Sequence, residues 1–355
     1  MIAEEDLLSD PVFQLNTVLW ALQDIPNESR VKAVLKDGGY YLMSIGRRLQ
    51  FPIDQNVRTT FLSDFQSTPS PTNPDIWLKH QTDDVHVLIE LKAHGFGTES
   101  TNVVQARKFL VSAVDLKDSL GLAETISGTI IYLTTDSDTA SLQATLSALS
   151  DELNQLGLAT ARSGCLGLVI IPGRGVALRG SDLDRLPAPM QSVLREPAIV
   201  LEDINDKNDL RPLYFIPWMP GIKDSQLPEL HAEGLRELTA RMLTAAASIV
   251  GKAQIPSTIS INPQVVLEMA TFGLFQNWHD SDRKLFEDEC SKILFNTLHS
   301  TGFVLSSGSP LQLDLPDETS KETILTRIMT ADPSNPSKNL EAALSRPPSL
   351  FDDNV

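Results

Sequence analysis

The chain has little cysteine and no long apolar run. Only two cysteines, Cys165 and Cys290, occur among its 355 residues. A CxxC pair and a Cys/His cluster are both absent, so we expect no structural zinc site. No apolar run approaches the ~20 residues that span a bilayer, and we expect no membrane partner. The acidic residues 1–6 lack the basic stretch of a secretory signal, so the sequence predicts a cytoplasmic protein whose cysteines are buried free thiols.

Basic residues are also scarce, because 29 Lys and Arg stand against 46 Asp and Glu, for a formal net charge of −17. This balance argues against a protein that coats nucleic acid through bulk charge. The acidic residues are unevenly distributed along the chain, however. Residues 26–117 hold 11 basic and 10 acidic side chains, a net of +1, which leaves −18 to the remainder. Because this segment is nearly neutral, it can approach a polyanion such as a nucleic acid. Binding of the nucleic acid would still need a partner or a local basic groove.

The remaining composition is that of an ordinary globular protein, with 41% apolar and 21% charged residues. Its length suits two domains. Residues 128–133 and 166–172 are apolar runs typical of buried strands, and residues 139–156 between them have helical spacing. This alternation predicts an α/β layer with parallel pairing. Beyond residue 227 the pattern predicts helices with almost no strand signal.

These patterns divide the chain into four predicted parts. They are an N-terminal helix (1–25), an α/β domain (26–222), a helical domain (223–308), and an acidic, Pro/Ser-rich, partly disordered tail (309–355).

The most informative stretch consists of two apolar runs around a short polar turn at residues 81–84. Asp75 opens the first run, and the second ends in Glu90-Leu91-Lys92. This pattern predicts a β-hairpin. Glu90 and Lys92 lie two apart in a strand, so both side chains leave the same face. We therefore expect the hairpin to bring two carboxylates and one ammonium to one edge of a sheet.

Such a trio suits metal-dependent cleavage of a phosphodiester. Mg²⁺ prefers one or two carboxylates, with waters and phosphate oxygens completing its shell, and Asp75 and Glu90 meet that requirement. Lys92 beside the metal can orient the attacking water or neutralise developing charge. Leu91 is expected to point into the core, while its backbone carbonyl offers another metal ligand.

These residues resemble the active-site signature of the PD-(D/E)xK nuclease superfamily. Asp75 matches its Asp, Glu90 its second acid and Lys92 its lysine. The resemblance implies a restriction-endonuclease-like fold, with a mixed sheet flanked by helices in the order α-β-β-β-α-β and the metal, Mg²⁺ or Mn²⁺, at the open edge of the central strands. Many members also have a Gln-x-x-x-aromatic pattern on the following helix. Here residues 105–109, QARKF, match it through Gln105, and Glu28 is the candidate for an additional acid from an early helix.

Five nearby side chains have two interpretations each. His86 shares the predicted strand face of Glu90, and it either lines the site or simply packs. His94 follows the lysine and either contacts substrate or belongs to an ordinary loop. Lys79, Arg107 and Lys108 either touch nucleic-acid phosphates or form a solvated surface.

The resemblance covers roughly residues 26–132 and implies a nuclease that cuts DNA, with Mg²⁺ or Mn²⁺, alongside a protein partner or as a homodimer. A bacterial defence or restriction system is one setting by analogy with the fold. A second Pro-Asp, at Asp317, precedes Lys321 without an expected flanking strand. Two alternatives stay open. Asp75 caps a turn in a plain surface hairpin, or the whole chain is a non-catalytic scaffold that binds partners through its helical domain and tail.

Overall fold

The computed structural model describes residues 4–24, 29–45, 74–82, 84–98, 100, 102–117, 122–202, 228–278, 280–306 and 308–333. The chain divides into two compact units. The described residues of the first unit end at residue 202, and those of the second begin at Pro228. The expected domain boundary at 222/223 lies outside the described residues.

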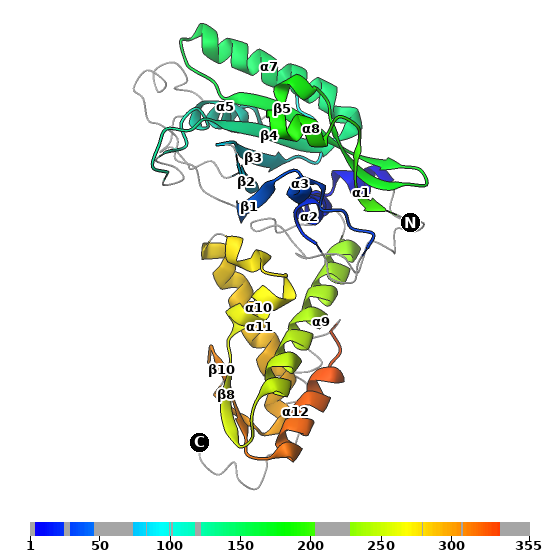
Figure 1. The fold of residues 1–355 in the computed structure, drawn as a ribbon, viewed down its shortest axis with the longest axis vertical. Coiled ribbons are helices and arrows are strands. Elements are labelled where there is room, and N and C mark those ends of the chain that lie inside the picture. The colour runs from blue at the N-terminus through cyan, green and yellow to red at the C-terminus, as the bar shows by residue number, and fades with distance from the viewer. Residues whose placement is uncertain are drawn as a thin grey trace. The chain divides into compact units, whose positions relative to one another are not determined.

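The described part of the first unit contains one seven-stranded mixed sheet, in the order β1-β2-β3-β4-β5-β6-β7 (Figure 1). Its strands are β1 (Tyr40–Ile45), β2 (Ile76–His80), β3 (His86–Leu91), β4 (Gly128–Thr135), β5 (Arg162–Ile171), β6 (Gly175–Gly180) and β7 (Ala198–Glu202). The central strands β3, β4 and β5 are parallel, whereas the pairs on either side of them are antiparallel. The predicted α/β layer with parallel pairing is confirmed.

Helices cover both faces of this sheet. They are α1 (Glu4–Ser9), α2 (Pro11–Leu22), α3 (Val34–Asp37), α5 (Asn102–Ser112), α7 (Thr139–Gln155) and the short α8 (Ala188–Val193). Helices α5 and α7 lie on one face, and α1 and α2 lie on the other (Figure 1). The β3–α5–β4 and β4–α7–β5 connections can therefore join parallel strands, which need a crossover.

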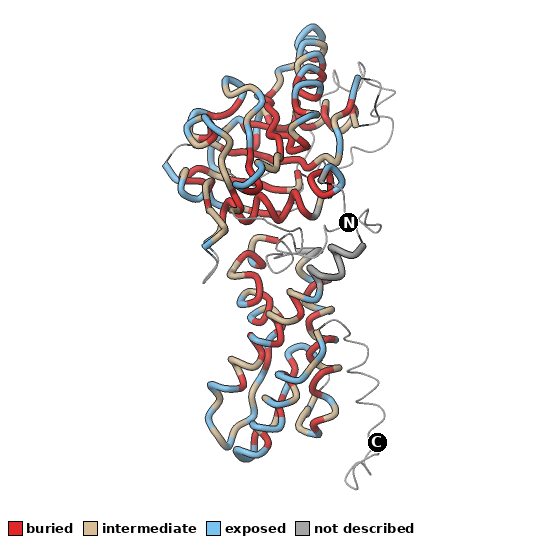
Figure 2. The backbone as a smooth tube through the Cα atoms, turned by 90° about the vertical axis from the view of Figure 1, so that its right-hand side faces the viewer, coloured by how far each residue is buried: buried red, intermediate tan, exposed pale blue. Residues whose placement is uncertain are grey.

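The predicted N-terminal helix is a pair of helices built into the first unit. Asp10 ends α1 and caps α2, because its Oδ1 accepts a hydrogen bond of 2.8 Å from the backbone N–H of Phe13. Pro11 occupies the first turn, where a missing N–H costs nothing. Nearly every described residue of α2 is buried, including polar ones such as Gln14. Figure 2 shows how burial varies along the backbone.

The main core lies between the sheet and helices α5 and α7. Phe109 and Leu110 of α5 pack with Leu146 of α7 against Leu88 and Ile130 of the sheet. Cys165 joins this core, while Cys290 is buried in the second unit, and both are free thiols as predicted. Burial raises the pKa of each thiol to about 12, so both stay neutral and unreactive.

The second unit is mostly helical, as expected. Its helices are α9 (Pro228–Lys252), α10 (Pro263–Ala270), α11 (Asp280–Leu298) and α12 (Glu318–Met329). It also contains a small antiparallel sheet that the sequence did not indicate, in the order β8-β10-β9, formed by β8 (Ser257–Ile261), β9 (Val304–Ser306) and β10 (Leu311–Leu315). Strand β10 alternates buried Leu311, Leu313 and Leu315 with more exposed positions, a period-2 pattern of short length.

The first part of the tail predicted for residues 309–355 forms regular structure. Residues 309–333 contain β10 and α12, and α12 packs against α9 and α11. The sequence predicts one short helix in this region, near residues 321–329, and α12 confirms it, with the buried side chains of Ile324 and Ile328 tying it to the unit. The rest of the predicted tail lies outside the described residues.

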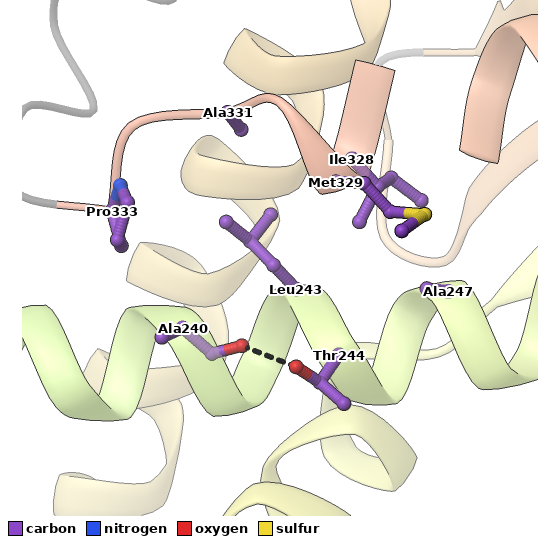
Figure 3. Close-up of a pocket in the computed structure, with 8 residues that line it drawn as sticks. All are labelled: Ala240, Leu243, Thr244, Ala247, Ile328, Met329, Ala331 and Pro333. Carbon is purple, nitrogen blue, oxygen red and sulfur yellow. Dashed lines mark hydrogen bonds between the residues drawn. The ribbon is translucent and has the colours of Figure 1, made fainter. Parts of the chain in front are cut away.

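A hollow of about 490 Å³ lies within the second unit, between α9 and the end of α12 (Figure 3). Its lining is apolar except for Thr244, whose hydroxyl donates to Ala240 O of its own helix at 2.9 Å. It therefore offers no converging polar groups for chemistry, and none of the predicted site residues lines it. Among the described helices, none combines the length and apolar character that crossing a bilayer needs.

Candidate active site

The predicted hairpin is formed by β2 and β3, which pair antiparallel with Ile76 opposite Ile89. Asp75 directly precedes β2, Glu90 is the next-to-last residue of β3, and Lys92 follows its end. The register therefore brings Asp75 beside Glu90 at one end of the hairpin. The backbone N–H of Leu91 donates to Asp75 Oδ2 at 2.7 Å, which fixes the Asp75 carboxyl against the neighbouring strand.

Glu90, Lys92 and Gln105 form a closed triangle of hydrogen bonds. Lys92 Nζ donates to Glu90 Oε1 and to Gln105 Oε1, both at 2.9 Å. Gln105 Nε2 donates in turn to Glu90 Oε1 at 2.8 Å. Gln105 reaches the strands from α5, as expected of the helix that follows the lysine. The side chains of Lys92 and Glu90 are 14% and 6% exposed, so the ion pair is largely shielded from solvent.

The two acids have raised pKa values. Burial raises the pKa of Asp75 well above its ordinary value, and the charge of Glu90 raises it further, while the Leu91 N–H and Lys92 oppose the rise. Burial also raises the pKa of Glu90, against the charge and hydrogen bond of Lys92 and the hydrogen bonds of Gln105 and Asp75. Two carboxyls that cannot easily ionise together retain a proton, and a cation bound between them would replace it.

The donor set fits a magnesium-like ion better than zinc. Among the described residues, no group of three or more His, Cys, Asp and Glu side chains is placed to hold a metal. A pair of carboxylates nevertheless suffices for Mg²⁺. Glu90 Oε2 is buried and has no hydrogen-bond partner in the described structure, so this oxygen is available as a ligand.

Two residues at the site were not predicted from the sequence. Tyr132 of β4 is paired with Glu90 of β3, so its side chain lies beside Glu90 on the same face of the sheet. Gln14 of α2 donates through Nε2 to the backbone carbonyl of Lys92 at 2.9 Å, and so holds the end of β3 from the other face. Gln14, Asn16 and Thr17 are polar residues within an otherwise apolar helix, and this was the available signal for Gln14. The strand register that places Tyr132 cannot be seen in the sequence.

The structure separates His86 and Lys79 from the acids. Both lie at the turn end of the hairpin, about 13 Å along β3 from Glu90 in the case of His86. His86 is a packed histidine, since its ring stacks on Trp77 and its Nδ1 accepts from Trp77 Nε1 at 3.0 Å. Burial lowers its pKa and keeps it neutral. Lys79 Nζ lies 3.8 Å from Asp84 Oδ1 in the same hairpin.

The other predicted residues differ in their surroundings. Arg107 on α5 donates to the Glu152 carboxylate of α7 at 2.9–3.3 Å, so it joins two helices. Lys108 is half-buried on the same helix. The side chain of His94 is 63% exposed just beyond Lys92, with Nδ1 3.9 Å from Asp138 Oδ2. Glu28 lies outside the described residues.

The carboxylates, the lysine and the glutamine predicted from the sequence thus meet at one end of the hairpin. Lys79 and His86 lie at its other end, where His86 has the packed role that was one of its two interpretations. Comparison with protein-family models, with curated proteins and with solved structures finds no match for this chain, so the functional case rests on the residues and geometry of the site itself.

Proposed function

We propose that the chain is a metal-dependent nuclease of the PD-(D/E)xK type that hydrolyses phosphodiester bonds, with DNA as its substrate. The observation that carries this proposal is the hydrogen-bonded triangle of Lys92, Glu90 and Gln105 beside a second buried acid, Asp75. A plain surface hairpin would leave its Glu–Lys pair in solvent, where such a pair contributes little to stability. Here the pair is shielded and joined to a separate helix.

Each residue has a role that its contacts support. Asp75 and Glu90 would hold the cation, with the backbone carbonyl of Leu91 as the third protein ligand. When bound, Mg²⁺ or Mn²⁺ stabilises charge on the phosphoryl oxygens and lowers the pKa of the attacking water. Lys92 has three N–H donors, and its two hydrogen bonds leave one to orient that water or meet a phosphate oxygen. Gln105 holds both Lys92 and Glu90 in place.

The order of elements supports the same proposal. Among the described residues, helix α3, strands β1, β2 and β3, helix α5 and strand β4 occur in the order α-β-β-β-α-β, which the resemblance implies. The acids lie where β3 ends and the antiparallel part of the sheet begins. A restriction-endonuclease-like fold is therefore part of the proposal.

The need for a partner follows from the net charge of the chain. With a net charge of −17, the chain repels DNA over much of its surface, so we assign it a protein partner or a second copy of itself. A homodimer would place two sites on a duplex, one for each strand. The two free buried thiols suit the reducing cytoplasm, and a bacterial defence or restriction system is the setting that we favour.

The direct test is a cleavage panel on Lys92→Ala. Purified wild type and variant are incubated with plasmid, linear, single-stranded and modified DNA and with RNA, in Mg²⁺ and in Mn²⁺. We expect wild type to cut DNA and Lys92→Ala to lose at least about 100-fold in rate, because the charge at the phosphate is gone. Lys32→Ala is the matched control, since Lys32 forms an exposed ion pair with Glu202 at 2.9 Å.

The same panel decides between a nuclease and a scaffold. If Lys92→Ala cuts as fast as wild type, the assigned site is not the source of cleavage. If wild type cuts none of the substrates with either metal and gains no thermal stability from Mn²⁺, the chain is a non-catalytic scaffold. Circular dichroism of Lys92→Ala, expected to match wild type, shows that any loss of rate is chemical.

A further inference from the structure

Two buried polar atoms at the site lack hydrogen-bond partners in the described structure, and they come from paired positions on neighbouring strands. One is Glu90 Oε2 of β3, and the other is the Tyr132 hydroxyl of β4. Paired residues of parallel strands lie about 5 Å apart and project to the same face. Buried polar groups are almost always hydrogen-bonded, directly or through an ordered water, so this coincidence requires an explanation.

The surroundings of Tyr132 leave Glu90 as its natural partner. Its ring packs edge-on against Phe96, with centroids 5.8 Å apart, and the residue is only 1% exposed. On its other side, Tyr132 is paired with Cys165 of β5, whose buried thiol stays neutral. Burial, followed by the charge of Glu90, raises the pKa of Tyr132, so the hydroxyl keeps its proton and can donate a hydrogen bond to a carboxylate or a water.

We propose that Tyr132 is a positioning residue for Glu90, with its hydroxyl linked to Glu90 Oε2 through one buried water. This inference rests on the proposed nuclease function, because it assigns Tyr132 the task of orienting a metal-binding carboxylate. Oε1 is already held by Lys92 and Gln105. A carboxylate oxygen accepts more than one bond, so Oε2 can serve both Tyr132 and a cation. Such supporting contacts typically change metal affinity 10- to 100-fold.

A double-mutant cycle tests the contact without any metal. Tyr132→Phe, Glu90→Gln and the double variant are unfolded in urea in the presence of a chelator. We expect the two changes to be non-additive, with a coupling of about threefold or more in the folding equilibrium. The control cycle uses Tyr40→Phe in place of Tyr132→Phe. Tyr40 is an equally buried tyrosine on β1 that packs against His80. Tyr40→Phe should be additive with Glu90→Gln.

Mn²⁺ binding tests the role. By titration calorimetry, Tyr132→Phe should bind Mn²⁺ about tenfold more weakly than wild type or Tyr40→Phe, and excess Mn²⁺ should restore most of its cleavage rate. A tyrosine that matters only for packing would show neither the weakened binding nor the rescue. Phenylalanine keeps the ring contact with Phe96, so the variant is expected to fold.

The outcomes separate this inference from the proposed function. Additivity in the Tyr132 cycle, or an unchanged Mn²⁺ affinity in Tyr132→Phe, overturns the positioning role and leaves the nuclease proposal intact. A wild-type chain that binds no Mn²⁺ instead removes the proposed function, and with it the orienting task. The cycle would then decide the Tyr132–Glu90 contact alone.

Discussion

Asp75 and Glu90 are acids placed where ionising both is costly. Burial and mutual repulsion raise the pKa of Asp75, and burial raises that of Glu90. An acid whose pKa is higher in the folded than in the unfolded chain favours folding while it is protonated. That advantage is complete below the unfolded value near 3.8 and is lost as the pH rises through the raised pKa.

Asp75→Asn should therefore remove the free-energy cost of ionising a buried acid beside Glu90 in the metal-free protein. The amide stays neutral at every pH, and its oxygen can still accept the Leu91 N–H. We expect the stability of the variant relative to wild type to increase steadily as the pH is raised from about 4 towards 8. Urea unfolding of both proteins across this pH range, in the presence of a chelator, measures the difference in their free energies of unfolding. Parallel pH profiles for the two proteins would contradict the prediction. Cleavage by the variant should be lost.

The individual residues were predictable to the extent that their positions follow from local geometry. Glu90 and Lys92 are two apart on one strand, so their shared face follows from the pleat alone. Tyr132 became visible only through the register of β3 and β4, which long-range pairing sets. Lys79 kept two interpretations because a hairpin has two ends and the sequence does not show which end a phosphate would contact; the structure places Lys79 at the turn end.

At the scale of elements, the same dipeptide, Pro-Asp, has two different roles. Pro74-Asp75 precedes a strand and delivers a carboxylate to Leu91 and Glu90. Asp317 follows β10, contrary to the expected lack of a flanking strand, and caps α12. Its Oδ1 accepts from Ser320 N at 2.8 Å, and Lys321 Nζ donates to Ala253 O at 2.9 Å. This second motif is structural.

Asp317→Ala should accordingly affect folding and leave cleavage alone. Loss of an N-cap carboxylate costs about 1 kcal/mol, because an N–H of the first helical turn loses its partner. We expect α12 to unfold at lower urea concentration, with a wild-type cleavage rate per folded molecule. Asp75→Ala is the counterpart, since it should abolish cleavage. A loss of cleavage in folded Asp317→Ala would contradict this division of roles.

Elements with strong helical periodicity or with a continuous apolar run of strand length could be predicted from the sequence. Helix α2, the β2–β3 hairpin, β4, α7 and β5 all lie where the patterns place them. The short strands β1, β9 and β10 were not predicted, because three to six residues contain too few repeats to separate strand from loop. Their pairing partners decide their structure.

At the scale of the whole molecule, the predicted chemistry belongs to one unit. The hairpin, α5 and β4 are all in the first unit, whereas the apolar hollow between α9 and α12 is in the second. A cation bound by Asp75 and Glu90 stabilises the native form of the unit that holds them, by about 2.7 kcal/mol at a hundred times the dissociation constant.

Hydrogen exchange can locate that stabilisation. With saturating Mn²⁺, backbone amides of β2, β3 and β4 should exchange more slowly, and amides of α9 and α11 should be unchanged. Glu90→Gln is the control and should show no slowing in either unit. Protection that spreads equally over both units, or persists in Glu90→Gln, would place the metal elsewhere.

The edge strand β7 is also paired with a segment from near the start of the chain. Lys32 N donates to Val200 O at 2.8 Å, Glu202 N donates to Arg30 O at 2.9 Å, and Val31 bridges Leu201. The residues that lead into α3 and β1 therefore find their partners only when β7 exists. During synthesis the hairpin leaves the ribosome long before β7, and such distant pairing forms late. We expect the nascent chain to lack a finished sheet until residue 202 has emerged, so this proposed DNA-cutting activity should not arise earlier in synthesis.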